Sequence, residues 1–242
     1  MPLPSAFRRA AAACAIVLAL PAQAGMFSVT PVRIFMTPRD RAVAVTIVNE
    51  GDTPVALQAE LNAWSQKADG TDELVPTEDM VLSPPIVKLA PRQRQVVRLA
   101  LVKPADASRQ LTYRMVIAEV PEATVPKGAT VELQVALALS MPVFVTPPVA
   151  QRAIACTAQA AAAAPAVDVK CSNTGSAYAQ VREITVTRGD RQLARFEGGA
   201  YLLPGATRTL QAKAGAAVAP GPARVTVGYD DGKSQVFDLV LP

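Results

Sequence analysis

One stretch in the second half of the chain alternates, residue by residue, between large apolar side chains and small or polar ones. From Val131 to Leu139 every odd position is Val or Leu, and the even positions are Glu, Gln and Ala. A period of two puts alternate side chains on opposite faces of a strand, whereas a helix of 3.6 residues per turn would scatter the same side chains around its circumference. We therefore predict a β-strand over residues 131–139, with one strongly apolar face.

The rest of the chain also favours strands joined by turns. Its 242 residues include 21 prolines, which argues against long helices, and only 5% are aromatic, so we expect a core of aliphatic layers. Pro31 predicts an edge strand or a switch between sheets, and the polar residues 65–79 predict a loop or an irregular edge. The other predicted strands are 27–36, 42–49, 55–64, 81–89, 95–101, 111–121, 150–157, 167–171, 180–187, 193–196, 201–202, 207–212, 223–229 and 234–241.

Pro147-Pro148 divides these strands into two sets with the turn spacing of β-sandwiches. We therefore expect two domains, at residues 25–148 and 149–242. The segments 47–55 and 169–177 both place β-branched residues before a turn that contains Asn, which suggests that the two domains are related.

Residues 1–24 have the organisation of a secretory signal peptide. Arg8 and Arg9 precede an apolar run, and the small-residue site Ala22-Gln23-Ala24 follows it, so we expect cleavage before Gly25. An uncleaved anchor is the alternative, which the shortness of the apolar run disfavours. Cleavage would leave 22 basic and 20 acidic residues, a balance that gives no general attraction to nucleic acid.

Two of the three cysteines, Cys156 and Cys171, remain after the leader and Cys14 are removed. One pair of cysteines in an exported protein favours a disulfide. A metal site is the alternative, but with no histidine anywhere in the chain two cysteines leave zinc or copper short of ligands.

The chain offers little for catalysis. Histidine, the commonest general base, does not occur, and Asp230-Asp231, the most obvious acid pair, is followed by Gly232 in the pattern of a turn. No phosphate-binding loop of the form G-x-x-x-x-G-K-[ST] is present. We expect a protein that is not an enzyme and that carries no cofactor and no metal.

Several short motifs stand in a specific order along the mature chain. They are Arg33-Ile34-Phe35, Val48-Asn49, Pro84-Pro85-Ile86, Gln95–Leu99, Tyr113-Arg114-Met115 and Leu133–Leu137, ending in Val143–Pro147, with Asn173-Thr174-Gly175 and Tyr229–Gly232 fitting less distinctively. In this order and spacing the sequence resembles the periplasmic pilus-assembly chaperones of the chaperone–usher pathway. The resemblance implies an all-β fold of two immunoglobulin-like β-sandwich domains set at an angle, with a cleft between them.

The resemblance also implies a function in the periplasm. Such chaperones bind pilus or surface-fibre subunits that lack their last strand, lend them the strand before the interdomain linker, and deliver them to an outer-membrane usher. The lent strand corresponds to residues 131–139, with Leu133, Val135 and Leu137 filling the subunit groove and Val131 and Leu139 as outer members. The alternation alone favours an ordinary core strand, and it is the resemblance that favours a lent strand instead.

The family anchors the terminal carboxylate of the subunit with two basic residues. Arg33 matches the first, but Pro142 stands where the second, a Lys, is expected, so we hypothesise that Arg114 on the neighbouring strand replaces it. The basic residue that ties the two domains in the family corresponds to Thr146, so we expect Asp230 to lack its usual partner. This departure indicates a divergent branch of the family.

Two other function classes compete with this interpretation. A secreted two-domain adhesion or surface-structural protein would need no client. A periplasmic hydrolase is disfavoured because the chain has neither histidine nor a nucleophile motif. The sequence does not indicate which subunit, usher or fibre type is involved.

Overall fold

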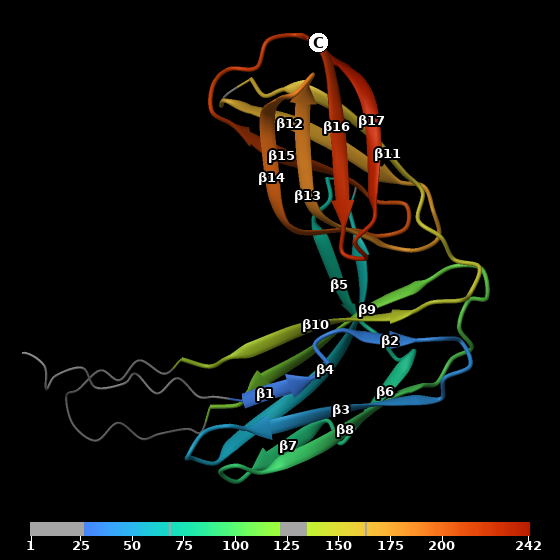
Figure 1. Ribbon diagram of the computed structural model, residues 1–242. Helices are drawn as coiled ribbons and strands as arrows, with labels where there is room; N and C mark the ends of the chain where they lie inside the picture. The colour runs from blue at the N-terminus through green and yellow to red at the C-terminus, as the bar shows by residue number, and fades with distance from the viewer. Residues whose placement is uncertain (1–26, 68, 122–134, 163) are drawn as a thin grey trace, which may run out of the picture.

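The computed structural model describes residues 27–67, 69–121, 135–162 and 164–242, which form strands and turns only (Figure 1). The predicted all-β class is confirmed. No helix long and apolar enough to cross a membrane is found among these residues.

The first half of the chain forms two sheets packed face to face, which we call the first sandwich. One sheet has the order β1-β3-β8-β6 and the other β2-β10-β9-β4-β5, with β7 paired to β4. The strands are β1 (Phe27–Thr30), β2 (Ile34–Met36), β3 (Ala42–Asn49), β4 (Val55–Gln66), β5 (Asp72–Pro76), β6 (Met80–Ser83), β7 (Ile86–Leu89), β8 (Arg94–Leu101), β9 (Leu111–Glu119) and β10 (Ala138–Val145).

The second half forms one curled seven-stranded sheet, which we call the second sandwich, with the order β11-β12-β15-β14-β13-β16-β17. Its two end strands approach each other, because Gln235 on β17 donates a hydrogen bond to the carbonyl of Ile154 on β11 at 3.1 Å. The strands are β11 (Ile154–Ala160), β12 (Ala166–Asn173), β13 (Ala179–Arg188), β14 (Arg191–Leu202), β15 (Thr207–Ala214), β16 (Gly221–Tyr229) and β17 (Ser234–Leu241).

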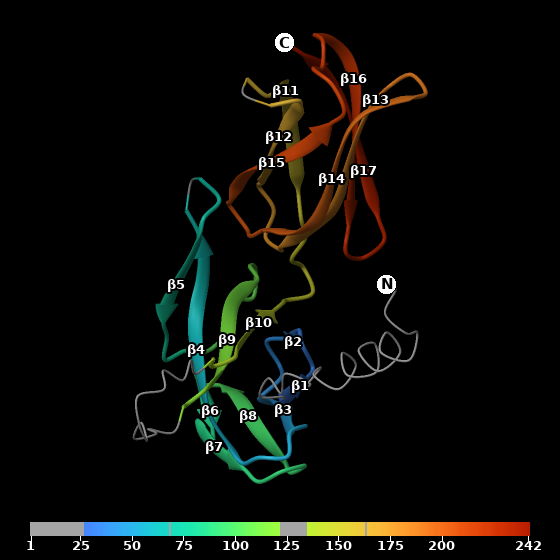
Figure 2. The ribbon, with the colours of Figure 1, turned by 90° about the vertical axis from the view of Figure 1, so that its left-hand side faces the viewer.

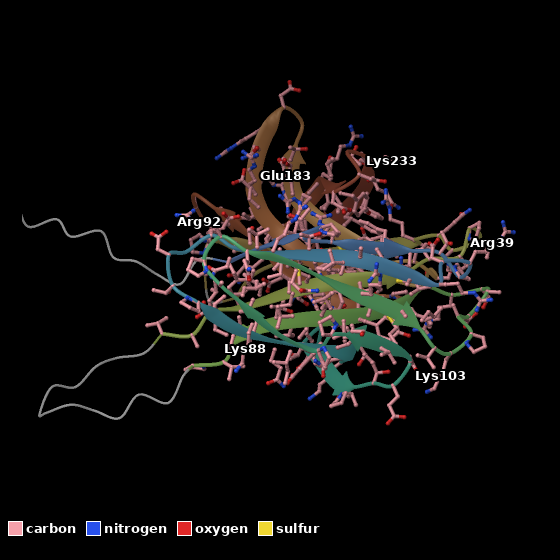
Figure 3. The ribbon with its side chains drawn as sticks, turned by 90° about the horizontal axis from the view of Figure 1, so that it is seen from below. Arg39, Lys88, Arg92, Lys103, Glu183 and Lys233 are labelled. Carbon is pink, nitrogen blue, oxygen red and sulfur yellow. A yellow bond between two sulfur atoms is a disulfide. The ribbon has the colours of Figure 1, made fainter. Side chains whose placement is uncertain are left out.

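Each sandwich has its own core of aliphatic side chains, as the composition predicts. Fully buried residues such as Val45, Leu99 and Ile117 fill the first, and Val169, Ile184 and Val227 fill the second. Charged residues project outward: Figure 3 shows Lys88 and Arg92 at one end of the first sandwich and Arg39 and Lys103 at the other. Burial of the apolar faces is therefore the main source of stability in both halves.

The predicted disulfide is present and joins β11 to β12. Cys156 and Cys171 lie directly opposite each other in the antiparallel register of these strands, with their Cα atoms 4.1 Å apart. The alanine-rich segment between the strands turns the chain, so this bond closes a local hairpin.

Residues 65–79, predicted as a loop or an irregular edge, contain β5, an edge strand that forms a hairpin with β4. Two strand predictions need correction. The predicted piece 81–89 is split by Pro84-Pro85 into β6 and β7, which lie in different sheets. Residues 193–202 form one strand, β14, through Gly198-Gly199. Pro31 separates β1 from β2 and does mark a switch between sheets.

The two segments that resemble each other in sequence also make the same hydrogen bonds. The side-chain amides of Asn49 and Asn173, both buried, donate to the carbonyl four residues later at 2.8 Å and accept the N–H two residues later at 2.9 and 3.0 Å. Equivalent buried asparagines as the last residues of β3 and β12 indicate that the two sandwiches are structurally related.

Candidate functional site

β10 has a free edge over part of its length. On one side it pairs with β9 from Ala138 to Val145, whereas on the other side β2 pairs only with Val143–Val145. Among the described residues, no strand covers the backbone of Ala138–Pro142 on that second side. An uncovered edge of this kind can take up another strand through backbone hydrogen bonds.

The odd-numbered side chains of this segment leave the core one after another toward the N-terminal end. Val143 is fully buried and Met141 is 4% exposed, while Leu139 is partly buried against the same core. Leu137 is 38% exposed and Val135 is 80% exposed. One continuous apolar row therefore begins inside the first sandwich and ends in solvent.

The strand lies further along the chain than the alternation predicts. We expected residues 131–139, but β10 spans Ala138–Val145, and Val135 and Leu137 precede it without strand geometry. Proline usually ends a strand, but Pro142 lies on the stretch of β10 that β2 leaves free, where a residue without an N–H is tolerated. Val131 and Leu133 lie outside the described residues.

The opposite face of β10 contributes to an aromatic cluster between the two sandwiches. Phe144 is fully buried and stacks on Tyr178 of the second sandwich, with ring centroids 4.0 Å apart. Trp64, at the end of β4, packs edge-on against Tyr201 of β14 at 5.0 Å. Figures 1 and 2 show the β4–β5 hairpin extending toward the second sandwich. The two sandwiches thus pack against each other through these aromatic rings.

Arg33 joins the two sandwiches through an ion pair. Its Nη1 atom donates to Oδ2 of Asp230 at 2.8 Å, and the hydroxyl of Tyr178 donates to the same oxygen at 3.2 Å. Burial raises the pKa of Tyr178, and the adjacent Asp230 raises it further, so the hydroxyl remains a donor. Position 146 is Thr and offers Asp230 no basic partner, and Arg33 pairs with Asp230 instead, from 197 positions away in the sequence, a contact that local patterns do not reveal.

Arg114 lies beside Pro142, the position at which the resemblance expects a second cation. It is directly opposite Pro142 in the β9–β10 register, and its Cζ atom stands 3.8 Å from the centroid of the Trp64 ring. Burial lowers the pKa of Arg114, and Asp72, whose Oδ2 atom is 4.0 Å from Nη2, acts against that shift. Burial raises the pKa of Tyr201, and the charges of Arg33 and Arg114 act against that shift. The Cζ atom of Arg114 is 5.5 Å from the centroid of the Tyr201 ring.

The paired acids Asp230 and Asp231 take part in ion pairs. Asp231 accepts two hydrogen bonds from Arg152, at 3.0 and 3.2 Å, and these bonds lower the pKa of Asp231 below its ordinary value. Both carboxylates therefore have structural partners on arginine. Within the described ranges, no group of three or more Cys, Asp or Glu side chains has an arrangement that could hold a metal ion.

Two interdomain residues have no signal in the sequence. Gln66 and Gln110 each hydrogen-bond to the backbone of the second sandwich. An isolated glutamine at a strand end resembles any solvated residue, and only knowledge of which sandwich surfaces face each other would have singled them out.

Comparison with known proteins agrees with this architecture. The chain is similar to the CsuC–CsuE chaperone–tip adhesion subunit pre-assembly complex from the archaic chaperone–usher Csu pili of Acinetobacter baumannii, with a TM-score of 0.66, 15% identity and coverage of 88% of this chain and 98% of that one. It is also similar to the E. coli chaperone DraB, with a TM-score of 0.57, 19% identity and coverage of 91% of this chain and 98% of that one. For the Salmonella enterica SafA pilin in complex with the SafB chaperone, the TM-score is 0.56, the identity 19% and the coverage 90% of this chain and 98% of that one. At these identities the likeness shows the fold. No curated protein matches the chain.

A family model gives the more specific result. The model described as "Pili and flagellar-assembly chaperone, PapD N-terminal domain" matches residues 26–151, more than half of the chain. The predicted fold of two immunoglobulin-like domains is confirmed by this match together with the all-β architecture. The chain therefore belongs to the family of pilus chaperones of the chaperone–usher pathway.

Proposed function

We propose that this chain is a periplasmic chaperone that caps pilus subunits by donor-strand complementation and delivers them to an outer-membrane usher. The observation that carries the proposal is the apolar row of β10, which leaves the core at Leu139 and continues through the exposed Leu137 and Val135 beside an uncovered strand edge. We include in the proposal the loss of residues 1–24 on export and the division into domains at 25–148 and 149–242.

Strand addition explains how such an edge would hold a subunit. Backbone hydrogen bonds along Ala138–Pro142 would provide affinity for any extended partner, and the row that contains Val135 and Leu137 would enter pockets of the subunit. Full burial of each Val or Leu side chain contributes about 1.5–3 kcal/mol. Leu133 and Val131 would extend the same row, and Leu139 would connect it to the core.

Arg33 and Arg114 would anchor the terminal carboxylate of the subunit. Arg33 uses only Nη1 for Asp230, and its side chain is 35% exposed, so other guanidinium donors remain accessible. Arg114 is held against Trp64 on the same side of the cleft. A guanidinium binds a carboxylate in a bidentate way, which suits both positions.

Release would not need a nucleotide, because the chain has no phosphate-binding loop. A strand from another subunit with better complementarity could replace the chaperone strand by exchange. This requirement fits an edge that binds through generic backbone hydrogen bonds and a small number of side chains.

The test is capture of a co-expressed subunit in the periplasm. Val135→Asp and Leu133→Asp should each abolish the one-to-one complex while the chaperone remains folded, because a carboxylate would be buried in an apolar pocket. Val240→Asp is the matched control, since Val240 is 72% exposed on β17, in the other sandwich. A Val135→Asp chaperone that still stabilised the subunit would disprove the lending role. An Arg114→Glu variant with unchanged capture would remove Arg114 from the anchor.

A further inference from the structure

Gln66, the last residue of β4, hydrogen-bonds to the backbone at the end of β14. Its Oε1 atom accepts the N–H of Leu203 and its Nε2 atom donates to the carbonyl of Tyr201, both at 3.0 Å. Nε2 also donates to Asp72 of β5 at 2.9 Å, which holds the side-chain amide in place. The amide thus pairs with alternate backbone groups of the second sandwich, as a neighbouring strand would.

Gln110, immediately before β9, makes similar hydrogen bonds to the second sandwich at a second point. Its backbone N–H donates to the carbonyl of Ser176 at 2.9 Å, and its Oε1 atom accepts the N–H of Tyr178 at 2.8 Å. Its Nε2 atom donates to the hydroxyl of Thr146 at 2.7 Å, next to the linker prolines. Gln110 is only 4% exposed, so these bonds are shielded from water.

The hydrogen bonds of Gln66 and Gln110 both reach the open end of the β13–β14 hairpin. Tyr178 directly precedes β13 and Tyr201 is the second-last residue of β14, and these strands pair there, with Ala179 opposite Leu202. The stacked rings of Phe144 and Tyr178 lie in the same interface. A hairpin end held at two separate points cannot rotate about the cluster without breaking hydrogen bonds at one of them.

We propose that Gln66 and Gln110 form an interdomain clamp that fixes the angle between the two sandwiches and thereby holds the cleft ready for its partner. Stacked rings tolerate sliding, because apolar contact is largely non-directional. The directional restraint must therefore come from hydrogen bonds and from the Arg33–Asp230 pair. Two charged side chains also hydrogen-bond to the second sandwich, namely Arg33 and Arg109, which donates to the carbonyl of Pro204 at 3.1 Å. The four glutamine hydrogen bonds to its backbone are neutral, so the restraint that they provide does not depend on charge.

This proposal predicts an interdomain angle that is nearly insensitive to salt. Ions screen exposed charge pairs strongly and neutral buried hydrogen bonds very little. Spin labels at Lys88→Cys and Lys213→Cys, both at exposed positions in different sandwiches, would report the distance distribution between the domains. We expect the width of that distribution to be the same at low and at high ionic strength.

The decisive variant is Gln66→Ala/Gln110→Ala in the doubly labelled full chain without any client. We expect the width of the distance distribution to increase at least about twofold, while circular dichroism and the unfolding transitions of each domain stay close to those of the parent. Gln58→Ala is the matched control, because Gln58 also lies on β4, is exposed, and its side chain hydrogen-bonds to Glu60 alone within the part of the chain that the structure describes. An unchanged distribution in the double variant would overturn the clamp. If the double variant does not fold, Gln66→Glu is used, because it keeps the acceptor for Leu203 and removes the donor to Tyr201.

The effect on client binding rests on the proposed function and is measured separately. If only about a tenth of the loosened molecules present the correct angle, apparent affinity for the subunit falls about tenfold. A broadened distribution with unchanged capture would refute the link between the clamp and binding. Loss of capture in Val135→Asp with an unbroadened distribution is the expected signature of a failed donor strand with an intact clamp, so the two ideas fail in distinguishable ways.

Discussion

The buried amide of Asn173 offers a direct test of how the second sandwich is held together. Its side chain is 1% exposed and makes four hydrogen bonds to backbone groups: it donates to the carbonyls of Ala177 and Leu202 at 2.8 and 3.0 Å and accepts from the N–H groups of Gly175 and Ala153 at 3.0 and 3.3 Å. Asn173→Ala removes all four and leaves their partners without an acceptor or donor. A typical hydrogen bond contributes about 1 kcal/mol net, and an orphaned buried group costs about 1–3 kcal/mol.

We therefore expect Asn173→Ala to lower the free energy of unfolding of the second sandwich by about 3–5 kcal/mol. With a urea slope of about 2 kcal/mol per molar, the midpoint of that domain should fall by about 2 M. Circular dichroism follows the unfolding of both sandwiches, and the fluorescence of Trp64 reports on the interface between them.

Asn62→Ala is the matched control, because Asn62 is partly buried on β4 and its side chain makes no hydrogen bond within the described residues. Asn49→Ala should destabilise the first sandwich by a similar amount, since its amide makes equivalent contacts. A midpoint shift for Asn173→Ala below about 0.5 M, or one equal to that of Asn62→Ala, would refute the assigned role of the two asparagines.

Three further predictions concern charge and cross-links. Hydrogen bonding to Lys103, opposed by burial, lowers the pKa of Asp79 below its ordinary value of 3.8, so the stability that Asp79 contributes is complete above pH 3.8 and is lost as the pH falls below it. Asp79→Asn should flatten the acid limb of a stability–pH curve, and an unchanged limb would contradict this assignment. Asp230→Asn should preserve subunit capture because the charge of Arg33 remains, whereas Arg33→Ala should reduce subunit capture. The amount of co-purified subunit measures both effects. An equal loss of co-purified subunit in the two variants would show that the ion pair matters more than the anchor. Replacing both disulfide cysteines by serine should lower the free energy of unfolding by about 3 kcal/mol, because the disulfide closes a loop of 15 residues. Urea unfolding measures this change, and a change near zero would contradict a stabilising role.

Local patterns predicted the class of the fold and most of its strands. The alternation of β4 and the β-branched run of β3 follow directly from one buried and one wet face. The related turns at Asn49 and Asn173 were visible as a faint repeat, and both asparagines proved to be buried. Such features depend on neighbours in sequence, which is why they can be read without a structure.

Contacts between the two sandwiches could not be predicted in the same way. Arg33 and Asp230 form an ion pair only because the β16–β17 loop of the second sandwich faces β2. The spacing of residues in the sequence does not predict this contact. β10 continues beyond the predicted residues 131–139 because residues 141–145 are buried on both faces, so the alternation ends while the strand goes on. Gln66 and Gln110 carry no pattern of their own, since their importance comes from the backbone groups they face.

The central claim is that the odd face of residues 131–139 enters the subunit, and site-specific photocrosslinking tests it most directly. A photoreactive amino acid is placed in turn at each position from 133 to 138, and the chaperone is irradiated in the periplasm with a co-expressed subunit. We predict crosslinks to the subunit from positions 133, 135 and 137 and few from 134, 136 and 138, because alternate side chains of a lent strand point into the partner. Equal crosslinking at odd and even positions, or none at any of them, would contradict donor-strand complementation by this segment.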